Sequence, residues 1–196
     1  MTSFPTVVVG RLSEGRAGAL LRAGEQAEPS YGPVGLLLTA DEADLDLSVE
    51  QVVGVGQDAF AAAVASFRSL DPQRAVATVW PAGAVAVEGA TVLIGLPFGP
   101  VTVVALNRVL AVVERPRRWG FAYATLPGHA EVGEEAFVVE HRADDTVVAR
   151  ITAKAHVALP LAKWIQPLLV PVQRRFAGRY LDAVQAGVVR SSAAPA

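Results

Sequence analysis

The sequence predicts an α+β fold in which a curved antiparallel β-sheet wraps around a long C-terminal α-helix. Between residues 75 and 157, short apolar runs separated by turn residues are typical of antiparallel strands. They are followed by one apolar stripe at helical spacing, about six turns long, which consists of Leu161, Ile165, Leu168, Val172, Phe176, Tyr180 and Val184. Such a stripe needs a large facing surface, and the preceding strands can supply one.

The first predicted elements are a short strand and a helix. Residues 6–9 are apolar enough for a strand. Ser13 is suited to the N-cap of a helix that runs to Gln26, because its hydroxyl can accept a hydrogen bond from a first-turn amide. Residues 1–30 are expected to be an N-terminal extension, and the Pro- and Gly-containing run 28–33 a loop.

A second strand and a second helix come next. Residues 45–53 alternate between apolar and polar side chains, which predicts a strand, and Gly54-Val55-Gly56 predicts a turn. A helix is predicted over residues 58–70, where helical spacing is kept by Phe60, Val64 and Phe67. Asp71-Pro72 is expected to end it, because the residue before a proline disfavours the helical conformation.

The centre of the chain is a series of strand candidates. They cover residues 75–80, 84–87, 91–96, 101–114, 118–126, 134–141 and 146–157. The run 89–107 carries no charge, but a hairpin is favoured over a membrane-spanning helix by its turn residues, Gly95, Pro97, Gly99 and Pro100. No stable membrane insertion is therefore expected.

The C-terminal helix contains two prolines. Pro167 and Pro171 each remove a backbone hydrogen bond, so a kink or a broken first half is expected. Residues 31–187 are predicted to form the main domain, and residues 188–196 a disordered tail.

Composition narrows the classes of function. With 196 residues, of which 52% are hydrophobic, the chain can bury one sizeable core. The net charge of −2 and the absence of a basic face argue against nucleic acid. No cysteine is present and the three histidines lack metal-site spacing, so no metal or other cofactor is expected. The N-terminus lacks the features of a signal peptide, which predicts a cytoplasmic protein.

Two motifs resemble those of a known family. They are Tyr123-Ala124-Thr125-Leu126-Pro127-Gly128-His129 and Gly133-Glu134-Glu135-Ala136-Phe137, and the following helix carries Pro167, Gln173 and Tyr180. Over about residues 30–183 the chain resembles the DUF1990 (UPF0548) family of actinobacteria and plants. The resemblance implies a helix-grip fold, like that of START-like (SRPBCC) and pollen-allergen proteins, whose sheet and helix enclose an apolar cavity. No established activity comes with the family.

The chain departs from the family pattern at two places. Relatives tend to carry Phe-Ser-Arg-Pro after the last strand, whereas this chain reads Lys154-Ala155-His156-Val157. The usual glycine after the motif tyrosine is Ala124. Any role of that serine and arginine is therefore absent or reassigned here.

The hairpin around these motifs holds the main candidate site. Strand alternation gives one face Trp119, Phe121, Tyr123 and Thr125. It gives one face of the partner run Glu135, Phe137 and Val139. If these faces coincide, Glu135 projects toward the cavity beside Tyr123, and burial raises its pKa toward that of a general acid or base. His129 on the turn would then titrate close to neutral pH.

Other interpretations of these residues stay open. Glu134 and Glu135 can face solvent or hold backbone amides of the turn, with Tyr123 in the core and His129 exposed. In the run 147–157 the even positions, which include Arg150, Thr152, Lys154 and His156, predict a solvated face. If that face instead lined the cavity, Lys154 and His156 would join the site.

Two functional hypotheses follow. The first is a protein that binds a hydrophobic small molecule, which is lipid-like, polyketide-like or polycyclic, in a cavity of roughly 300–1,000 Å³. Its predicted ligand-binding residues are Trp80, Asn107, Phe121, Thr125, Phe137, Lys154, Trp164 and Tyr180. The second is a cofactor-independent cyclase, dehydratase or isomerase, by analogy with polyketide cyclases, whose predicted catalytic residues are Glu135, Tyr123, His129 and His156. A homodimer is compatible with either hypothesis.

Overall fold

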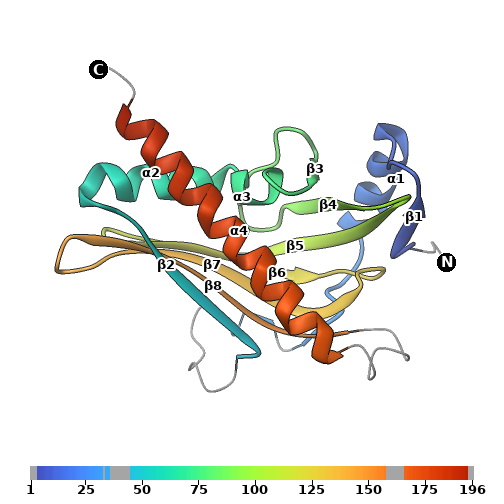
Figure 1. Ribbon diagram of the computed structural model, residues 1–196. Helices are drawn as coiled ribbons and strands as arrows, with labels where there is room; N and C mark the ends of the chain where they lie inside the picture. Colours follow the sequence, from blue (N-terminus) through green and yellow to red (C-terminus); the bar gives the residue numbers. More distant parts are fainter. Residues whose placement is uncertain (1–3, 33, 36–44, 158–165, 194–196) are drawn as a thin grey trace.

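The computed structural model describes residues 4–32, 34–35, 45–157 and 166–193 (Figure 1). Its strands are β1 (Val7–Val9), β2 (Leu47–Val55), β3 (Thr78–Trp80), β4 (Thr91–Phe98), β5 (Val101–Arg115), β6 (Arg118–Thr125), β7 (Glu131–His141) and β8 (Thr146–Val157). Its helices are α1 (Glu14–Glu25), α2 (Gly56–Arg68), α3 (Asp71–Arg74) and α4 (Gln166–Ala193).

All eight strands belong to one antiparallel sheet. Seven of them follow the order β2-β8-β7-β6-β5-β4-β3, and β1 pairs with the start of β5. Figure 1 shows a curved sheet that α4 crosses diagonally, on the side where α2 and α3 also lie. The predicted α+β helix-grip fold, a curved antiparallel sheet around a long C-terminal helix, is therefore confirmed.

The sheet buries apolar side chains on both of its faces. Strand alternation in β5 turns Ala105 and Val109 toward the helices α2 and α4 and turns Val104 and Leu106 toward α1. The α4 side, here called the concave face, carries the larger core. Because α1 covers the other face of β3–β5 and β1 pairs with β5 within the sheet, the N-terminal residues pack as part of the sheet structure.

The N-terminal elements agree with the sequence prediction. The strand predicted at 6–9 is β1, and the helix predicted up to Gln26 is α1. Ser13 is its N-cap, and its side chain accepts a hydrogen bond from the Arg16 amide at 3.4 Å. A capping oxygen therefore defines where this helix begins, as the sequence indicated.

The segment after β2 differs from the prediction. Gly54 and Val55 still belong to β2, and Gly56 begins α2 with a φ of 87°, so strand and helix join without a separate turn. At Gly54 a Cβ would lie 2.6 Å from the Cβ of Ala59, which explains the glycine by close packing.

Two further boundaries in this region were predicted wrongly. Asp71-Pro72 does not end the second helix: α2 stops at Arg68, and Pro72 lies in the first turn of α3, where no backbone donor is needed. Residues 84–87 form no strand, because the Ala86 amide bonds the Arg68 carbonyl at 2.8 Å instead of a neighbouring strand.

The C-terminal helix is placed differently from the prediction. Pro167 is in its first turn, where it removes no helical bond, and the helix continues through Pro171. Of the predicted stripe, Val172 is 48% exposed and Phe176 is half-buried. The buried stripe consists of Ala177, Tyr180, Leu181, Val184 and Val188.

Other predictions for this helix fall at its two ends. Leu161, Ile165 and the Leu168 side chain lie outside the described residues. At the other end, α4 continues to Ala193 and Val188 is buried, so the tail predicted from residue 188 is helical up to that point. No helix among the described residues has the length and apolarity needed to span a membrane.

Candidate functional site

The concave face of β6 and β7 carries the predicted aromatic cluster. Tyr123 lies opposite Glu135 and Phe121 lies opposite Phe137, so the predicted register is confirmed. The Phe121 and Phe137 rings stack at 4.8 Å between centroids, and Tyr180 of α4 approaches Phe137 at 6.1 Å. Antiparallel pairing thus brings the predicted site residues of two strands together beneath α4, while their roles in binding or catalysis stay predictions.

Glu135 and Tyr123 form a hydrogen-bonded pair. The Tyr123 hydroxyl donates to Glu135 Oε2. Burial raises the pKa of Glu135 to about 7, the Tyr123 hydrogen bond opposes that rise, and the nearby Glu131 adds to it. Burial and the same carboxylate hold the pKa of Tyr123 well above its usual value. Glu135 therefore exchanges its proton near neutral pH while Tyr123 keeps its own.

A second carboxylate lies on the same face. Glu131 and Glu135 are each two residues from Gly133 along β7, so their side chains share one face of the sheet. Gln173 of α4 donates a hydrogen bond to Glu131 Oε1 at 2.8 Å. Burial raises the pKa of Glu131. Sequence reasoning missed Glu131 because the strand was predicted to start at residue 134, and counting back in twos from Glu135 would have found it.

Close packing requires a glycine at position 133, between the two glutamates. A Cβ there would lie 2.1 Å from the Lys154 carbonyl oxygen on β8, so only glycine fits. Its amide donates to Thr125 Oγ1 at 3.1 Å. This close contact holds the start of β7 against β6 and β8 and so fixes where Glu131 and Glu135 project.

Two buried amide side chains near the cluster retain unused hydrogen-bonding atoms. Asn107 is 1% exposed, and its Nδ2 donates to the Ala105 carbonyl at 3.2 Å, whereas its Oδ1 has no partner among the described residues. Gln73 of α3 is fully buried near the Tyr123 hydroxyl, and its amide lowers the pKa of that hydroxyl. Neither polar atom of the Gln73 amide forms a hydrogen bond of normal geometry with the described residues. Asn107 was predicted, and Gln73 gave no signal in the sequence.

The prediction that His129 titrates close to neutral pH was wrong. His129 Nδ1 accepts a hydrogen bond from the Glu131 amide at 2.9 Å. Burial lowers the pKa of His129 to about 4, so the ring is neutral at pH 7 and does not titrate there. Its role in the structure is to hold the turn that leads into β7.

Lys154 and His156 lie on the opposite face of the sheet from Glu135. Ala153, the residue opposite Glu135, faces the concave core, so the even positions of β8 face away from α4. His156 is exposed and Lys154 half-buried. The solvated face predicted for this strand is therefore only partly correct, since Thr152 on the same face is 6% exposed, and neither Lys154 nor His156 joins the Glu135 cluster.

Glu134 also lies on this opposite face, but it is buried. It is only 2% exposed, and its Oε1 accepts a hydrogen bond from the Gly35 amide at 2.5 Å. It thus holds a backbone amide, as one of the open interpretations has it, but the amide belongs to the segment before β2 and not to the hairpin turn.

Trp80 was misplaced by sequence reasoning and Trp164 lies outside the described residues. Trp80 packs in the second core beneath α1, and its Nε1 donates to Glu14 Oε1 at 2.8 Å. It is therefore on the wrong face of the sheet for the predicted cavity. Thr125 and Tyr180, by contrast, lie on the concave face with Phe121 and Phe137.

Side chains of the concave face are more exposed toward its carboxylate end. Phe121 and Phe137 are fully buried beneath α2 and α4, whereas Glu131 and Glu135 are only half-buried. The predicted cavity stays a prediction, because the side chains of residues 158–170, which include the first turn of α4, are outside the described part.

The chain is similar in sequence to one protein family and in fold to several solved structures. The family model described as "Domain of unknown function (DUF1990)" matches residues 43–183. A UPF0548 protein of Deinococcus radiodurans is 42% identical over 101 residues, which are 47% of this chain and 51% of that protein. The matched segment thus spans about half the length of this relative.

Two solved structures are similar in fold. A hypothetical protein of Helicobacter pylori has a TM-score of 0.60 at 13% identity, over 82% of this chain and 98% of its own. Protein Ms6760 of Mycobacterium smegmatis has a TM-score of 0.54 at 13% identity, over 77% of this chain and 95% of its own. At this identity the likeness concerns the fold alone.

Proposed function

The chain belongs to the DUF1990 family, and from this premise and the concave site we propose that it binds a hydrophobic small molecule between the sheet and α4. The proposed ligand is lipid-like, polyketide-like or polycyclic. Its apolar body would lie along the aromatic rings of the concave face. Its polar group would lie toward Glu131 and Glu135, where side chains of that face are only half-buried.

The hydrogen-bonded pair of Glu135, which is half-buried, and Tyr123, which is buried, is the observation that carries this proposal. A carboxyl group placed among apolar side chains is costly for folding, and the single hydrogen bond from Tyr123 offsets only part of that cost, since the pKa of Glu135 stays raised. The nearby Asn107 Oδ1 lacks a partner among the described residues, although nearly all buried polar atoms in folded proteins are paired. A ligand with a hydrogen-bond donor would satisfy such groups, which is the usual design of an apolar pocket with a few polar contacts.

A second candidate function is favoured by the pKa of Glu135. A carboxyl group with a pKa of about 7 can both take and return a proton at neutral pH. With Tyr123 as its hydrogen-bond partner, Glu135 would act as the general acid or base of a cofactor-free cyclase, dehydratase or isomerase. His129 and His156 have no part in this candidate, since the first stays neutral and the second lies on the other face.

Native mass spectrometry of the purified protein tests the binding proposal. The expected result is a species heavier than the chain by the mass of one small molecule, lost on denaturation. A fluorescent apolar probe, 8-anilinonaphthalene-1-sulfonate, should bind the emptied protein and be displaced by the recovered molecule. Absence of both signals would contradict the proposal.

A pair of variants separates the two functions. If the protein only binds, Glu135→Gln should change the affinity for the recovered molecule modestly, because the amide keeps the shape and a hydrogen bond. If it is an enzyme, the same variant should lose turnover while it keeps affinity. The matched control is Glu140→Gln, on the same strand but on the opposite face, which should alter neither.

A further inference from the structure

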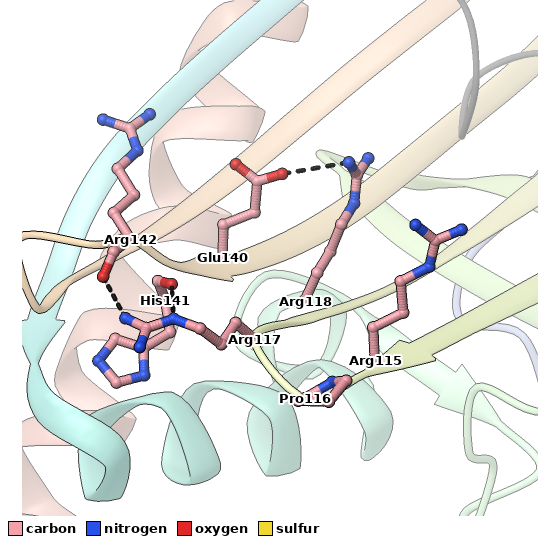
Figure 2. Close-up of a pocket in the computed structure, with 7 residues that line it drawn as sticks. All are labelled: Arg115, Pro116, Arg117, Arg118, Glu140, His141 and Arg142. Carbon is pink, nitrogen blue, oxygen red and sulfur yellow. Dashed lines mark hydrogen bonds and ion pairs between the residues drawn. The ribbon is translucent and has the colours of Figure 1, made fainter.

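A hollow lies at the end of β6 and β7 that is farther from Glu135. It has a volume of about 440 Å³ and is lined by Arg115, Pro116, Arg117, Arg118, Glu140, His141 and Arg142 (Figure 2). Arg118 and Glu140 are opposite each other, five pairs along the ladder from Tyr123 and Glu135. At a strand rise of about 3.4 Å per residue the hollow is roughly 17 Å from the carboxylate pair. This hollow is called the arginine pocket below.

The arginine pocket is strongly basic. Its charged lining consists of four arginines against one glutamate, with His141 in addition. Part of this charge is compensated: Arg118 is paired with Glu140, Arg142 shares Glu50 with Arg150, and His141 bonds Asp145 at 2.6 Å. Arg115 and Arg117 have no carboxylate partner among the described residues, so their positive charge stays uncompensated.

Arg117 is held in place by neutral groups. Its Nε donates to the His141 carbonyl at 2.7 Å, and its Nη2 donates to the Arg142 carbonyl, as the dashed lines in Figure 2 show. These bonds orient the guanidinium without neutralising it, since both acceptors are uncharged. Arg117 thus presents a fixed positive charge with remaining N–H donors.

Arg115 and Arg118 lie opposite each other at the two ends of the turn. Arg118 is held by Glu140 at 3.3 Å. Arg115 is exposed and makes no hydrogen bond or ion pair within the ranges that the structure describes. In Figure 2 the side chains of Arg115, Arg118 and Glu140 extend on the same side of the turn. The turn therefore offers one free and one pre-oriented guanidinium beside a single hollow.

We infer that the arginine pocket binds a phosphate-bearing anion. Guanidinium groups match the oxygens of phosphate with paired hydrogen bonds, and a doubly charged group suits a lining of four arginines and one glutamate better than a single carboxylate does. The volume accommodates a small phosphorylated compound. The same chemistry would also accept the phosphate of a lipid headgroup.

Titration of the isotopically labelled protein with inorganic pyrophosphate, followed by NMR at constant ionic strength, tests the inference. Amide shifts are expected at residues 115–118 and 140–142. Arg115→Gln should weaken the affinity by about tenfold or more, through loss of one charge-assisted contact. Arg117→Lys keeps the charge but loses the paired geometry, and should also weaken it.

The matched control is Arg190→Gln. Arg190 is exposed in the last turn of α4, so its loss should leave the pyrophosphate affinity unchanged. Equal loss in Arg115→Gln and Arg190→Gln would show a nonspecific charge effect and overturn the inference.

Two further arms identify the source of the phosphate. Vesicles of phosphatidylcholine with phosphatidic acid should sediment the wild-type protein, and not Arg115→Gln, if a headgroup is bound; pure phosphatidylcholine vesicles are the blank. Shifts with pyrophosphate and no sedimentation assign a free phosphorylated compound. No response to either probe overturns the inference. Because Glu135→Gln leaves this pocket intact, the outcome is independent of the proposed apolar site.

Discussion

At the scale of single residues, the Glu135 carboxyl shows how three neighbours set a pKa. Burial and Glu131 favour the protonated form, whereas the Tyr123 hydroxyl favours the charged one, and the pKa comes to about 7. Its ordinary value is 4.5. The folded protein therefore holds a proton that the unfolded chain releases.

This difference predicts how stability changes with pH. Glu135 contributes most to stability below pH 4.5, and the contribution is lost as pH rises through about 7. Glu135→Gln has no carboxyl group to titrate, so this loss of stability should be absent from the variant. Between pH 5 and pH 8 the unfolding free energy of wild type should therefore fall relative to that of the variant by on the order of 2 kcal/mol. Urea unfolding at both pH values measures this. A wild type and variant that change in parallel would mean that Glu135 is not desolvated.

At the scale of elements, α4 stabilises the fold through the side of the helix that the structure places inside. Leu181 is 1% exposed, whereas Val172 on the same helix is 48% exposed. Leu181→Ala should lower the unfolding free energy by about 2–5 kcal/mol, because it leaves a cavity in the core. The control Val172→Ala should cost about 0.5 kcal/mol or less. Equilibrium denaturation compares them, and equal effects would contradict the burial of α4.

The start of β7 depends on a residue without a side chain. Gly133→Ala should reduce the unfolding free energy by several kcal/mol, since its Cβ would overlap the Lys154 carbonyl on β8. Gly178→Ala is the matched control: no atom lies within 4 Å of its Cβ, and alanine should stabilise α4 by about 0.5–1 kcal/mol. Thermal unfolding of both variants should give shifts of opposite sign.

At the scale of the whole molecule, the sheet separates two hydrophobic cores, one on each of its faces. The concave core supports the carboxylate end, while α1 covers the outer face of β3–β5 and β1 pairs with β5. The same pair of strands, β6 and β7, carries the Glu135 cluster at one end and the arginine pocket at the other. One rigid hairpin therefore positions both candidate sites.

This architecture predicts that the N-terminal layer is needed for stability. Removal of residues 1–26 would expose Leu93, Leu106 and Leu126, which are at most 2% exposed in the full chain. The shortened protein should aggregate, or lose more than about 10 °C in Tm, because several buried leucines become exposed. Scanning calorimetry and light scattering measure this. An unchanged Tm would mean that residues 1–30 are the separable extension that the sequence suggested.

Local patterns in the sequence were sufficient to predict the fold class and the pairing of Tyr123 with Glu135 in the candidate site. Alternation along β6 and β7 placed Tyr123 and Glu135 on one face, and Ser13 marked the start of α1. These features depend on residues close together in the chain, so side-chain periodicity and capping chemistry are enough to predict them.

Only the tertiary structure decided which distant residues meet. It brought Gln73 to the Tyr123 hydroxyl and Gln173 to the Glu131 carboxylate. It placed Trp80 beneath α1 and turned Lys154 away from Glu135. It also selected the buried side of α4. Each of these results depends on which face of the sheet a helix covers. That choice is made by packing between segments far apart in sequence, whose side-chain patterns fit either face equally well.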